Sequence, residues 1–373
     1  QSIAKSIAKN IAKSIAKPIA KSIAKSIAKS IAKYNAKYIA KYNAKYIAKT
    51  IAKFIGASKN SIIFTKSATE SINLVAESWG YDNLKSGNVV LLTDMEHHSN
   101  IIPWQMAAEK YSLKINYINI TESFDLDLDH FESLLSAKTK VVSIVGESNM
   151  SGMLPDIQKL NSLIKEKTDA IYIVDGAQLV PHRKIDVQEL GIDFICVSGH
   201  KMLGPTGIGV VWGRKELLEK LDPVYGGGDM IEEVFYDSAT WAPVPHKFEA
   251  GTPPYVEAIG LGAAVDYLSD LTMAKVQKHS DNLRMYAKNI LENIENTQKI
   301  KFIGFKEGAA LASVLAFDFS VYNINNSIQP KVCLCAIQSS SPGNQALQSA
   351  ILHAIDHTLS FNVPHLFGSR EYY

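Results

Sequence analysis

The chain has 373 residues, 46% of them hydrophobic, and its 39 lysines and arginines nearly balance 37 aspartates and glutamates. A chain of this size and composition can bury a large core and is typical of about two domains. No run of about 18 uncharged apolar residues occurs, which argues against a transmembrane helix, and three cysteines are too few for a disulfide framework. The sequence therefore predicts a protein of a reducing, cytoplasmic compartment.

The near-neutral net charge is the sum of two unlike parts. Residues 2–53 repeat a four-residue unit, mostly Ser-Ile-Ala-Lys, and contain thirteen lysines, no arginine and no acidic residue. The rest of the chain therefore holds 26 basic side chains against 37 acidic ones, a net charge of −11. Because an acidic body repels the phosphate backbone, no nucleic-acid partner is expected.

The repeat predicts a disordered or fraying helical arm over residues 1–53. A four-residue period advances about 400° around a helix, so the isoleucine stripe winds around the axis instead of holding one face. Pro18 interrupts the helix as well. A surface tether or an organellar transit peptide is the functional alternative, but transit peptides are typically rich in arginine. The preferred interpretation is low-complexity sequence without a specific role.

From about Ser61 onward, short apolar runs alternate with amphipathic stretches. Strands are predicted at residues 62–65, 89–93, 115–118, 141–145, 170–175, 194–198 and 208–212. Helices are predicted between them, at residues 69–78, 129–136 and 155–166. This order indicates an α/β fold with a mostly parallel central sheet that is covered on both faces. In such a sheet the ligand binds beyond the carboxyl ends of the strands.

Two of these strand ends carry candidate catalytic groups. The fifth strand ends on Asp175, and a buried carboxylate needs a cation or several hydrogen-bond donors, although a helix cap is an equal alternative. The sixth strand leads into Ser198-Gly-His-Lys201. Lys201 is either a surface lysine or an amine whose lowered pKa makes it nucleophilic. The glycines that follow do not have the spacing of a P-loop.

A third strand end leads into Ser67-Ala-Thr-Glu70, which has the pattern of a helix capping box. The start of a helix directly after a strand can bind an anion, because its first N–H groups are free and the helix dipole is positive there. Taken alone, the segment is more often a plain helix cap.

Seven segments together resemble the class V aminotransferases, and within them the branch of cysteine desulfurases and selenocysteine lyases. They occur in the order and approximate spacing of that family between about residues 53 and 270. The segments are Thr65-Lys-Ser-Ala-Thr-Glu-Ser-Ile-Asn73, Glu96-His-His-Ser-Asn100, Glu147-Ser-Asn-Met-Ser-Gly152, Val174-Asp-Gly-Ala-Gln178, Ser198-Gly-His-Lys201, Tyr225-Gly-Gly-Gly228 and Phe248-Glu-Ala-Gly-Thr252.

The resemblance implies a pyridoxal phosphate (PLP) enzyme of fold type I and no metal. It implies a large PLP-binding domain at residues 54–250 and a smaller α+β domain at residues 251–373, which is divergent and ends early. Lys201 would hold PLP as a Schiff base and move the substrate Cα proton. Asp175 would pair with the pyridine nitrogen, and His97 would stack on the ring and relay a proton.

The same resemblance implies the remaining cofactor contacts. Asn149 and Gln178 look like the ligands of the ring hydroxyl oxygen. The phosphate would rest on the start of the helix and on side chains around it. The residues implied there are Ala68, Thr69, Ser198 and His200, with Thr252 reaching the phosphate of the neighbouring subunit in a homodimer.

The implied activity is that of a cysteine desulfurase, which converts L-cysteine to L-alanine and passes the sulfur to an acceptor protein for iron–sulfur cluster assembly. The persulfide cysteine is not at its expected place, where an ungapped alignment puts His353. Cys333 and Cys335 lie about twenty residues too early, and Arg370 is the weak candidate for the substrate carboxylate. Selenocysteine lyase or another PLP β-lyase, and a non-catalytic PLP-fold binding homologue, are therefore the alternatives.

Overall fold

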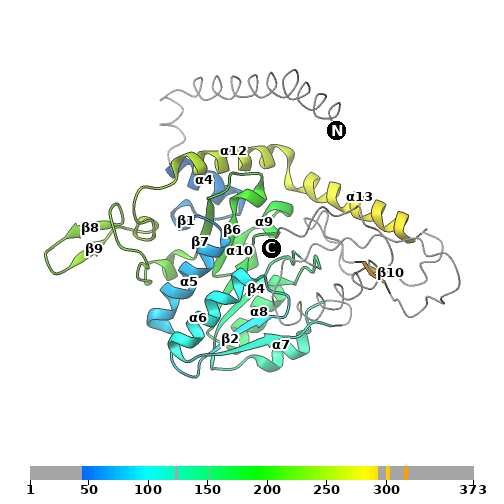
Figure 1. The fold of residues 1–373 in the computed structure, drawn as a ribbon, viewed down its shortest axis with the longest axis horizontal. Helices are drawn as coiled ribbons and strands as arrows, with labels where there is room; N and C mark the ends of the chain where they lie inside the picture. Colours follow the sequence, from blue (N-terminus) through cyan, green and yellow to red (C-terminus); the bar gives the residue numbers. More distant parts are fainter. Residues whose placement is uncertain (1–43, 122–124, 150, 293–299, 303–314, 318–373) are drawn as a thin grey trace, which may run out of the picture. The chain divides into compact units, whose positions relative to one another are not determined.

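A seven-stranded sheet forms the centre of the computed structural model, which describes residues 44–121, 125–149, 151–292, 300–302 and 315–317 (Figure 1). The strand order is β1-β7-β6-β5-β4-β2-β3, and only β7 runs antiparallel to its neighbours. The strands are β1 (Ile62–Thr65), β2 (Val89–Thr93), β3 (Lys114–Ile118), β4 (Thr139–Val145), β5 (Ile171–Asp175), β6 (Phe194–Ser198) and β7 (Gly209–Gly213). All seven predicted strands are present, and the predicted α/β fold is confirmed.

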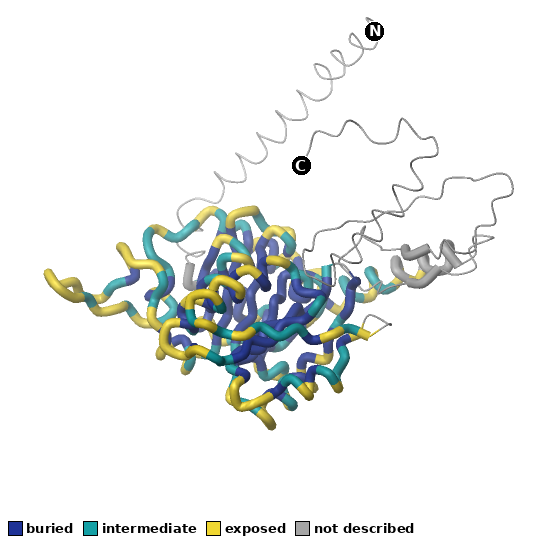
Figure 2. The backbone as a smooth tube through the Cα atoms, turned by 60° about the horizontal axis from the view of Figure 1, so that its bottom comes forward, coloured by how far each residue is buried: buried dark blue, intermediate teal, exposed yellow. Residues whose placement is uncertain are grey.

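Both faces of this sheet are buried except at the edge strand β3, which explains why the other strands read as continuous apolar runs. On β5, Ile171 and Ile173 belong to a core cluster that also contains Leu74 of α5 (Ala68–Asn83) and Trp104 of α6 (Ile102–Tyr111). The alternate side chain Val174 points to the other face and has no exposed surface. The buried sheet is the dark blue centre of Figure 2. Successive side chains point to opposite faces, so both faces must be covered by other elements.

Helices and short 3₁₀ turns connect the strands and extend beyond them. The predicted helices are present with longer or slightly shifted bounds. Besides α5 and α6, the helices are α4 (Ala44–Phe54), α7 (Leu128–Leu134), α8 (Ile157–Lys167), α9 (Leu179–His182), α10 (Val187–Leu190), α11 (Lys215–Leu218), α12 (Tyr255–Leu271) and α13 (Met273–Glu292), with the 3₁₀ turns η2 (Lys59–Ser61), η3 (His98–Asn100), η4 (Gly199–Met202) and η5 (His246–Phe248).

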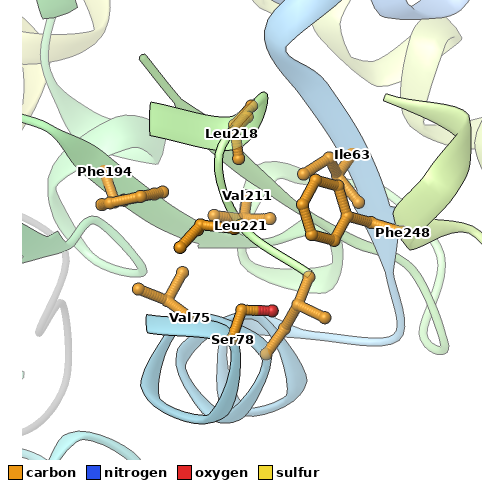
Figure 3. Close-up of a pocket in the computed structure, with 9 residues that line it drawn as sticks. Ile63, Val75, Ser78, Phe194, Val211, Leu218, Leu221 and Phe248 are labelled. Atoms are coloured by element: carbon orange, nitrogen blue, oxygen red, sulfur yellow. The ribbon is translucent and has the colours of Figure 1, made fainter. Parts of the chain in front are cut away.

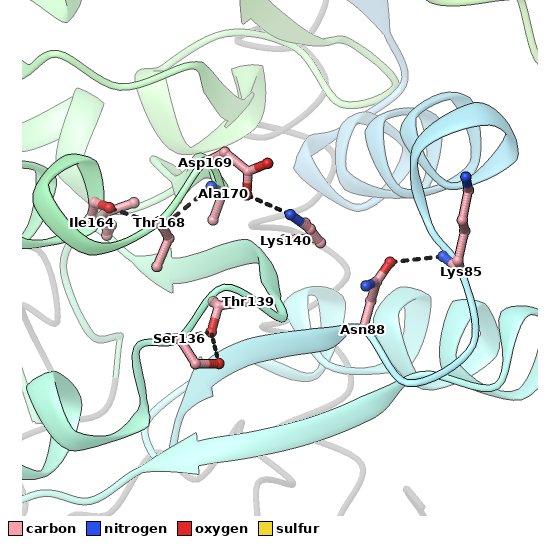
Figure 4. Close-up of polar contacts among 9 residues, drawn as sticks. All are labelled: Lys85, Asn88, Ser136, Thr139, Lys140, Ile164, Thr168, Asp169 and Ala170. Carbon is pink, nitrogen blue, oxygen red and sulfur yellow. Dashed lines mark hydrogen bonds and ion pairs between the residues drawn. The ribbon is translucent and has the colours of Figure 1, made fainter.

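Polar contacts close the turns at the amino ends of the parallel strands (Figure 4). Before β2, the Lys85 N–H donates to Asn88 Oδ1 at 2.8 Å. Before β5, the Ala170 N–H donates to Thr168 Oγ1 at 3.2 Å, and Lys140 of β4 pairs with Asp169 at 2.6 Å. These contacts hold the turns that lead into β2 and β5.

Part of the repeat belongs to the compact body. The body begins at Ala48 as a compact unit, five residues before the predicted end of the arm at residue 53. In α4 the side chains of Ile51 and Ala52 are 2% exposed. A period of four keeps the same face over two turns before the stripe drifts away, which is enough for this short segment to pack. Residues 1–43 of the arm lie outside the described residues.

Beyond the sheet, a two-stranded hairpin of β8 (Ile231–Val234) and β9 (Ala239–Trp241) extends from the body (Figure 1). Helices α12 and α13 follow. Farther along the chain, β10 (Ile300–Phe302) pairs with β11 (Leu315–Phe317). No helix in the described ranges is both long and apolar enough to cross a membrane.

A small void lies between α5 and the sheet (Figure 3). Its lining is apolar apart from Ser78, whose hydroxyl donates to the Asp222 carbonyl at 3.0 Å. The space is on the scale of a single water molecule. It is therefore a packing gap of the core and cannot hold a cofactor.

Candidate active site

The predicted cofactor residues gather at one edge of the sheet. Because β1, β2, β4, β5 and β6 all point the same way, their carboxyl ends meet there. These ends are Thr65, Thr93, Val145, Asp175 and Ser198. The segments that follow them contain the residues predicted to bind PLP.

Lys201 and Asp175 influence each other electrostatically at the ends of β6 and β5. Asp175 is 4% exposed and accepts a hydrogen bond from the Ala177 N–H at 3.0 Å. Burial raises the pKa of this carboxyl, while the Ala177 bond and the positive charge of Lys201 act against that rise. Burial lowers the pKa of the half-buried Lys201 amine, and Asp175 partly offsets the change. A lysine with a lowered pKa has a larger neutral, nucleophilic fraction.

Four residues form what we call the cup, namely Ser67, Ala68, Thr69 and Ser198. Ser67 is the N-cap of α5, and its side chain accepts from the Glu70 N–H at 3.4 Å. The Ala68 N–H donates to Ser198 Oγ at 2.9 Å, which joins the start of α5 to the end of β6. Thr69 is exposed. The predicted helix cap is therefore real, and it lies where a phosphate binding at the start of α5 would need it.

Gly209 allows the cup to lie close to the sheet. A Cβ atom at this position would come within 2.6 Å of both Ser67 Cα and the Val197 carbonyl oxygen. Both are backbone atoms that cannot rotate away, so a larger residue would push α5 and β6 apart. This contact explains one glycine of the run that follows Lys201.

His97 lies beside the cup at the start of η3 and is half-buried. Its Nδ1 atom accepts from the Ser99 N–H at 3.1 Å and lies 3.0 Å from Ser99 Oγ. Ser99 Oγ is in turn 2.8 Å from Thr69 Oγ1. Burial, together with the neighbouring His98 and Lys201, lowers the pKa of the His97 imidazole to about 4. The ring is therefore neutral at pH 7.

Glu96 is fully buried beneath this edge and anchors the segment that carries His97. Its Oε1 accepts from the Thr93 hydroxyl at 2.6 Å and from the Val145 N–H at 2.9 Å. Its Oε2 accepts from Asn100 Nδ2 at 2.7 Å. The Asn100 amide has a fixed orientation, because its oxygen faces the indole N–H of Trp104, which can only donate. Burial raises the pKa of Glu96 to about 7 against these donors.

Asn149 lies on the segment that follows β4, and Gln178 lies on the segment that follows β5. The Asn149 side-chain oxygen is buried and has no hydrogen-bond partner within the described part of the chain. Gln178 is the half-buried N-cap residue of α9. The two segments are joined by a buried ion pair in which Arg183 Nε donates to Glu147 Oε2 at 3.2 Å.

Two other residues predicted to bind the cofactor phosphate are exposed, and no hydrogen bond within the described part of the chain joins their side chains to the cup. His200 is exposed on η4, and Thr252 is exposed in the segment before α12. Next to Thr252, the Gly251 N–H donates to the Gly228 carbonyl at 2.8 Å, so two of the family segments touch. Glu249 Oε1 accepts from the N–H of Phe64 on the edge strand β1 at 2.8 Å.

The weakest sequence predictions lie outside the described residues. These are the substrate arginine, the position aligned with the persulfide cysteine and the two late cysteines, namely Arg370, His353, Cys333 and Cys335. Cys196 lies on β6 and is buried, and burial raises the pKa of its thiol well above the ordinary value. It is therefore unsuited to act as a sulfur acceptor.

Sequence reasoning did not find Ser99, Arg183 or the anchoring role of Glu96. Ser99 and Glu96 stand inside a segment that the family resemblance identified, but nothing in their spacing shows which atoms they contact. Arg183 is 36 positions from its partner, and only the fold reveals the pair. Among the described residues, no cluster of histidine, cysteine, aspartate and glutamate is arranged to hold a metal ion.

A comparison with protein-family models shows which family the chain belongs to. The family model for class V aminotransferases matches residues 13–329. The chain belongs to the class V aminotransferases. The family resemblance inferred from the motifs is thus confirmed, and the match extends into the repeat and beyond residue 270.

The relatives of this class V aminotransferase include several cysteine desulfurases. A probable cysteine desulfurase of Synechocystis is 47% identical over 234 residues, which cover 62% of this chain and 56% of the relative. The structure of the cysteine desulfurase CsdA from Escherichia coli has a TM-score of 0.70 and 28% identity, covering 88% of this chain and 86% of that one. The structure of a cysteine desulfurase from Thermococcus onnurineus has a TM-score of 0.64 and 34% identity, covering 70% of this chain and 64% of that one. The chain spans less than two thirds of the length of the curated relatives it matches.

The residues at this edge fit PLP, the cofactor of this enzyme family. The site offers a lysine with a lowered pKa, a buried carboxylate and the start of a sixteen-residue helix. The side-chain oxygen of Asn149, which is buried and has no hydrogen-bond partner among the described residues, also suits a polar ligand, since an amide can turn either its oxygen or its NH2 toward a bound group.

Proposed function

We propose that this class V aminotransferase is a PLP-dependent cysteine desulfurase that converts L-cysteine to L-alanine and releases the sulfur to an acceptor thiol. The observation that carries the proposal is that Lys201 and the buried Asp175 follow neighbouring strands beside the cup and influence each other electrostatically. Those elements supply a nucleophilic amine, a carboxylate for a ring nitrogen and a place for a phosphate.

Each residue has a separate task in this proposal. When bound, PLP supplies a ring that accepts the electrons freed at the substrate Cα. Lys201 would hold the cofactor covalently and, when released, move the proton at Cα. Asp175 would keep the ring nitrogen protonated, the cup would bind the phosphate, and Asn149 with Gln178 would bind the ring hydroxyl oxygen.

The overall reaction requires an acceptor for the sulfur. The C–S bond of L-cysteine breaks, Cβ gains a proton to give L-alanine, and the sulfur leaves on a thiol as a persulfide. Burial argues against Cys196 as that thiol. We infer that a thiol elsewhere in the chain or on an acceptor protein takes the sulfur, in line with the role in iron–sulfur cluster assembly implied by the sequence. A homodimer, in which Thr252 serves the neighbouring subunit, agrees with the exposure of this residue.

The curated relatives favour desulfurase over the other activities, because relatives that are 46–47% identical are named probable cysteine desulfurase. A selenocysteine lyase or another β-lyase would use the same cofactor residues. A binding homologue would keep the cofactor site and lack turnover. The experiment therefore has to separate cofactor binding from each reaction.

The first test is the cofactor itself. Protein with PLP is expected to be yellow, with an absorbance band at about 420 nm. The Lys201→Ala variant should lose this band, while Lys215→Ala, which removes an exposed lysine, should keep it. A wild-type protein that gains no band with added PLP would refute the proposal.

The second test is turnover. Alanine is measured after incubation with L-cysteine and a thiol acceptor, and in parallel with L-selenocysteine. We expect alanine from L-cysteine with wild-type protein and none with Lys201→Ala. Alanine from L-selenocysteine alone would identify a lyase, and a yellow protein that forms alanine from neither would identify the binding homologue.

A further inference from the structure

The side chain of Ser99 connects Thr69 of the cup to His97. Thr69 Oγ1 lies 2.8 Å from Ser99 Oγ, and Ser99 Oγ lies 3.0 Å from His97 Nδ1. The Ser99 backbone N–H also donates to the same Nδ1 atom at 3.1 Å. Ser99 is buried and Thr69 is exposed, so the chain runs from the interior to the rim of the cup.

The backbone contact fixes the direction of these hydrogen bonds. An N–H can only donate, so His97 Nδ1 must be an acceptor and carries no proton. The Ser99 hydroxyl then donates to Nδ1 as well, and the Thr69 hydroxyl donates to Ser99 Oγ. The proton of the neutral imidazole is therefore on Nε2.

We propose that Ser99 is a positioning residue that holds His97 as its Nε2–H tautomer and makes this preference depend on an anion bound at Thr69. The inference rests on the proposed function, which assigns the cup to the cofactor phosphate. When Nε2 carries the proton, it can give it to a group bound beside Lys201.

The dependence on the anion follows from the two states of the Ser99 hydroxyl. When the Thr69 hydroxyl donates to a phosphate, its oxygen can accept only from Ser99 Oγ–H. The Ser99 hydroxyl then turns away from His97 Nδ1 and presents its lone pairs to that atom. One of the two donors that hold Nδ1 unprotonated is lost, so the preference for the Nε2–H tautomer weakens.

The experiment measures the tautomer ratio of His97 by 15N NMR of histidine-labelled protein at neutral pH. The His97→Gln spectrum assigns the signal, which is needed because the His98 ring centroid lies only 3.9 Å away. In protein free of cofactor, wild type should be mainly Nε2–H. Ser99→Ala should lower the ratio of Nε2–H to Nδ1–H roughly fivefold, the effect of one ordinary hydrogen bond. Ser99→Thr, which keeps the hydroxyl, should restore it.

Inorganic phosphate is the probe of the coupling. At saturating phosphate, wild type should shift toward the Ser99→Ala ratio, and the Ser99→Ala ratio should not move. Thr69→Val keeps Ser99 and His97 in place but removes the outer hydroxyl, so its tautomer ratio should match wild type and ignore phosphate. Thr69 is on the surface, so this variant stays informative if Ser99→Ala does not fold.

Several outcomes would overturn the inference. They are a wild-type His97 that is mainly Nδ1–H, a Ser99→Ala ratio equal to wild type, a wild-type ratio that phosphate does not change, or equal responses of Thr69→Val and wild type. The proposed function fails separately, by the absence of the PLP band. The tautomer in cofactor-free protein does not depend on that band.

Discussion

Removing the charge of Arg183 should expose how much the buried ion pair with Glu147 stabilises the active-site edge. Glu147 has no exposed surface, and the Arg183 side chain is 14% exposed. The variant Arg183→Met leaves the Glu147 carboxylate buried without this cation. Breaking a buried pair in this way costs about 3–5 kcal/mol of unfolding free energy. Because the arginine side has some contact with water, we expect about 3 kcal/mol.

Glu147→Gln tests whether the buried charge is the cause, because it should destabilise the wild-type protein but stabilise the Arg183→Met variant. Glu147→Gln removes the charge but keeps an oxygen for Arg183 Nε, so it should cost about 1–2 kcal/mol. The double variant Arg183→Met/Glu147→Gln should be more stable than Arg183→Met alone, because the Glu147 charge is no longer buried. The measurement is urea unfolding followed by fluorescence and by circular dichroism. The exposed Lys215–Glu219 pair is the matched control, and Lys215→Met should change stability by less than about 0.5 kcal/mol.

Two results would refute this reasoning. One is a cost of less than about 1 kcal/mol for Arg183→Met, which would mean that water or a rearranged side chain neutralises Glu147. The other is a double variant that is less stable than Arg183→Met, which would mean that packing of the arginine stem, and not charge, supplies the stability.

Three further predictions concern other parts of the same edge. Glu96→Gln should destabilise the protein by about 2 kcal/mol in denaturant unfolding, because its new NH2 group would face the NH2 group of Asn100; an unchanged midpoint would contradict the orientation of these amides. Gly209→Ala should cost about 1–3 kcal/mol through its backbone clash, whereas Gly226→Ala, with open space around it, should be nearly neutral by thermal unfolding; equal effects would rule out the clash. The NMR signal of His97 should titrate at about 4. Because the folded-state pKa lies below the ordinary value of 6.5, the stability that His97 contributes is present above pH 6.5 and is lost as the pH falls through about 4. A pH profile of unfolding that is the same in wild type and His97→Gln would contradict this.

The sequence by itself predicted the central sheet and pointed to the residues that we propose bind the cofactor. Each strand is a short Val- and Ile-rich run bounded by polar or glycine-containing segments, and strands buried on both faces need little more information than this. The rule that ligands bind at the carboxyl ends of parallel strands pointed to Asp175 and Lys201 as residues that belong together. The cap at Ser67 followed from residues only three positions apart.

Only the tertiary structure decided which residues support that site. The side chain of Glu96 is anchored by a strand 49 positions away, and Arg183 meets Glu147 across 36 positions. Ser99 reaches Thr69 across 30 positions. A composition or a period contains no information about such pairs, because they are set by which strands are neighbours and by how closely Gly209 lets α5 approach the sheet. The repeat is a second case in which the sequence pattern alone was not enough. Its period gives one apolar face over two turns, and the fold alone determined that the face of α4 is buried.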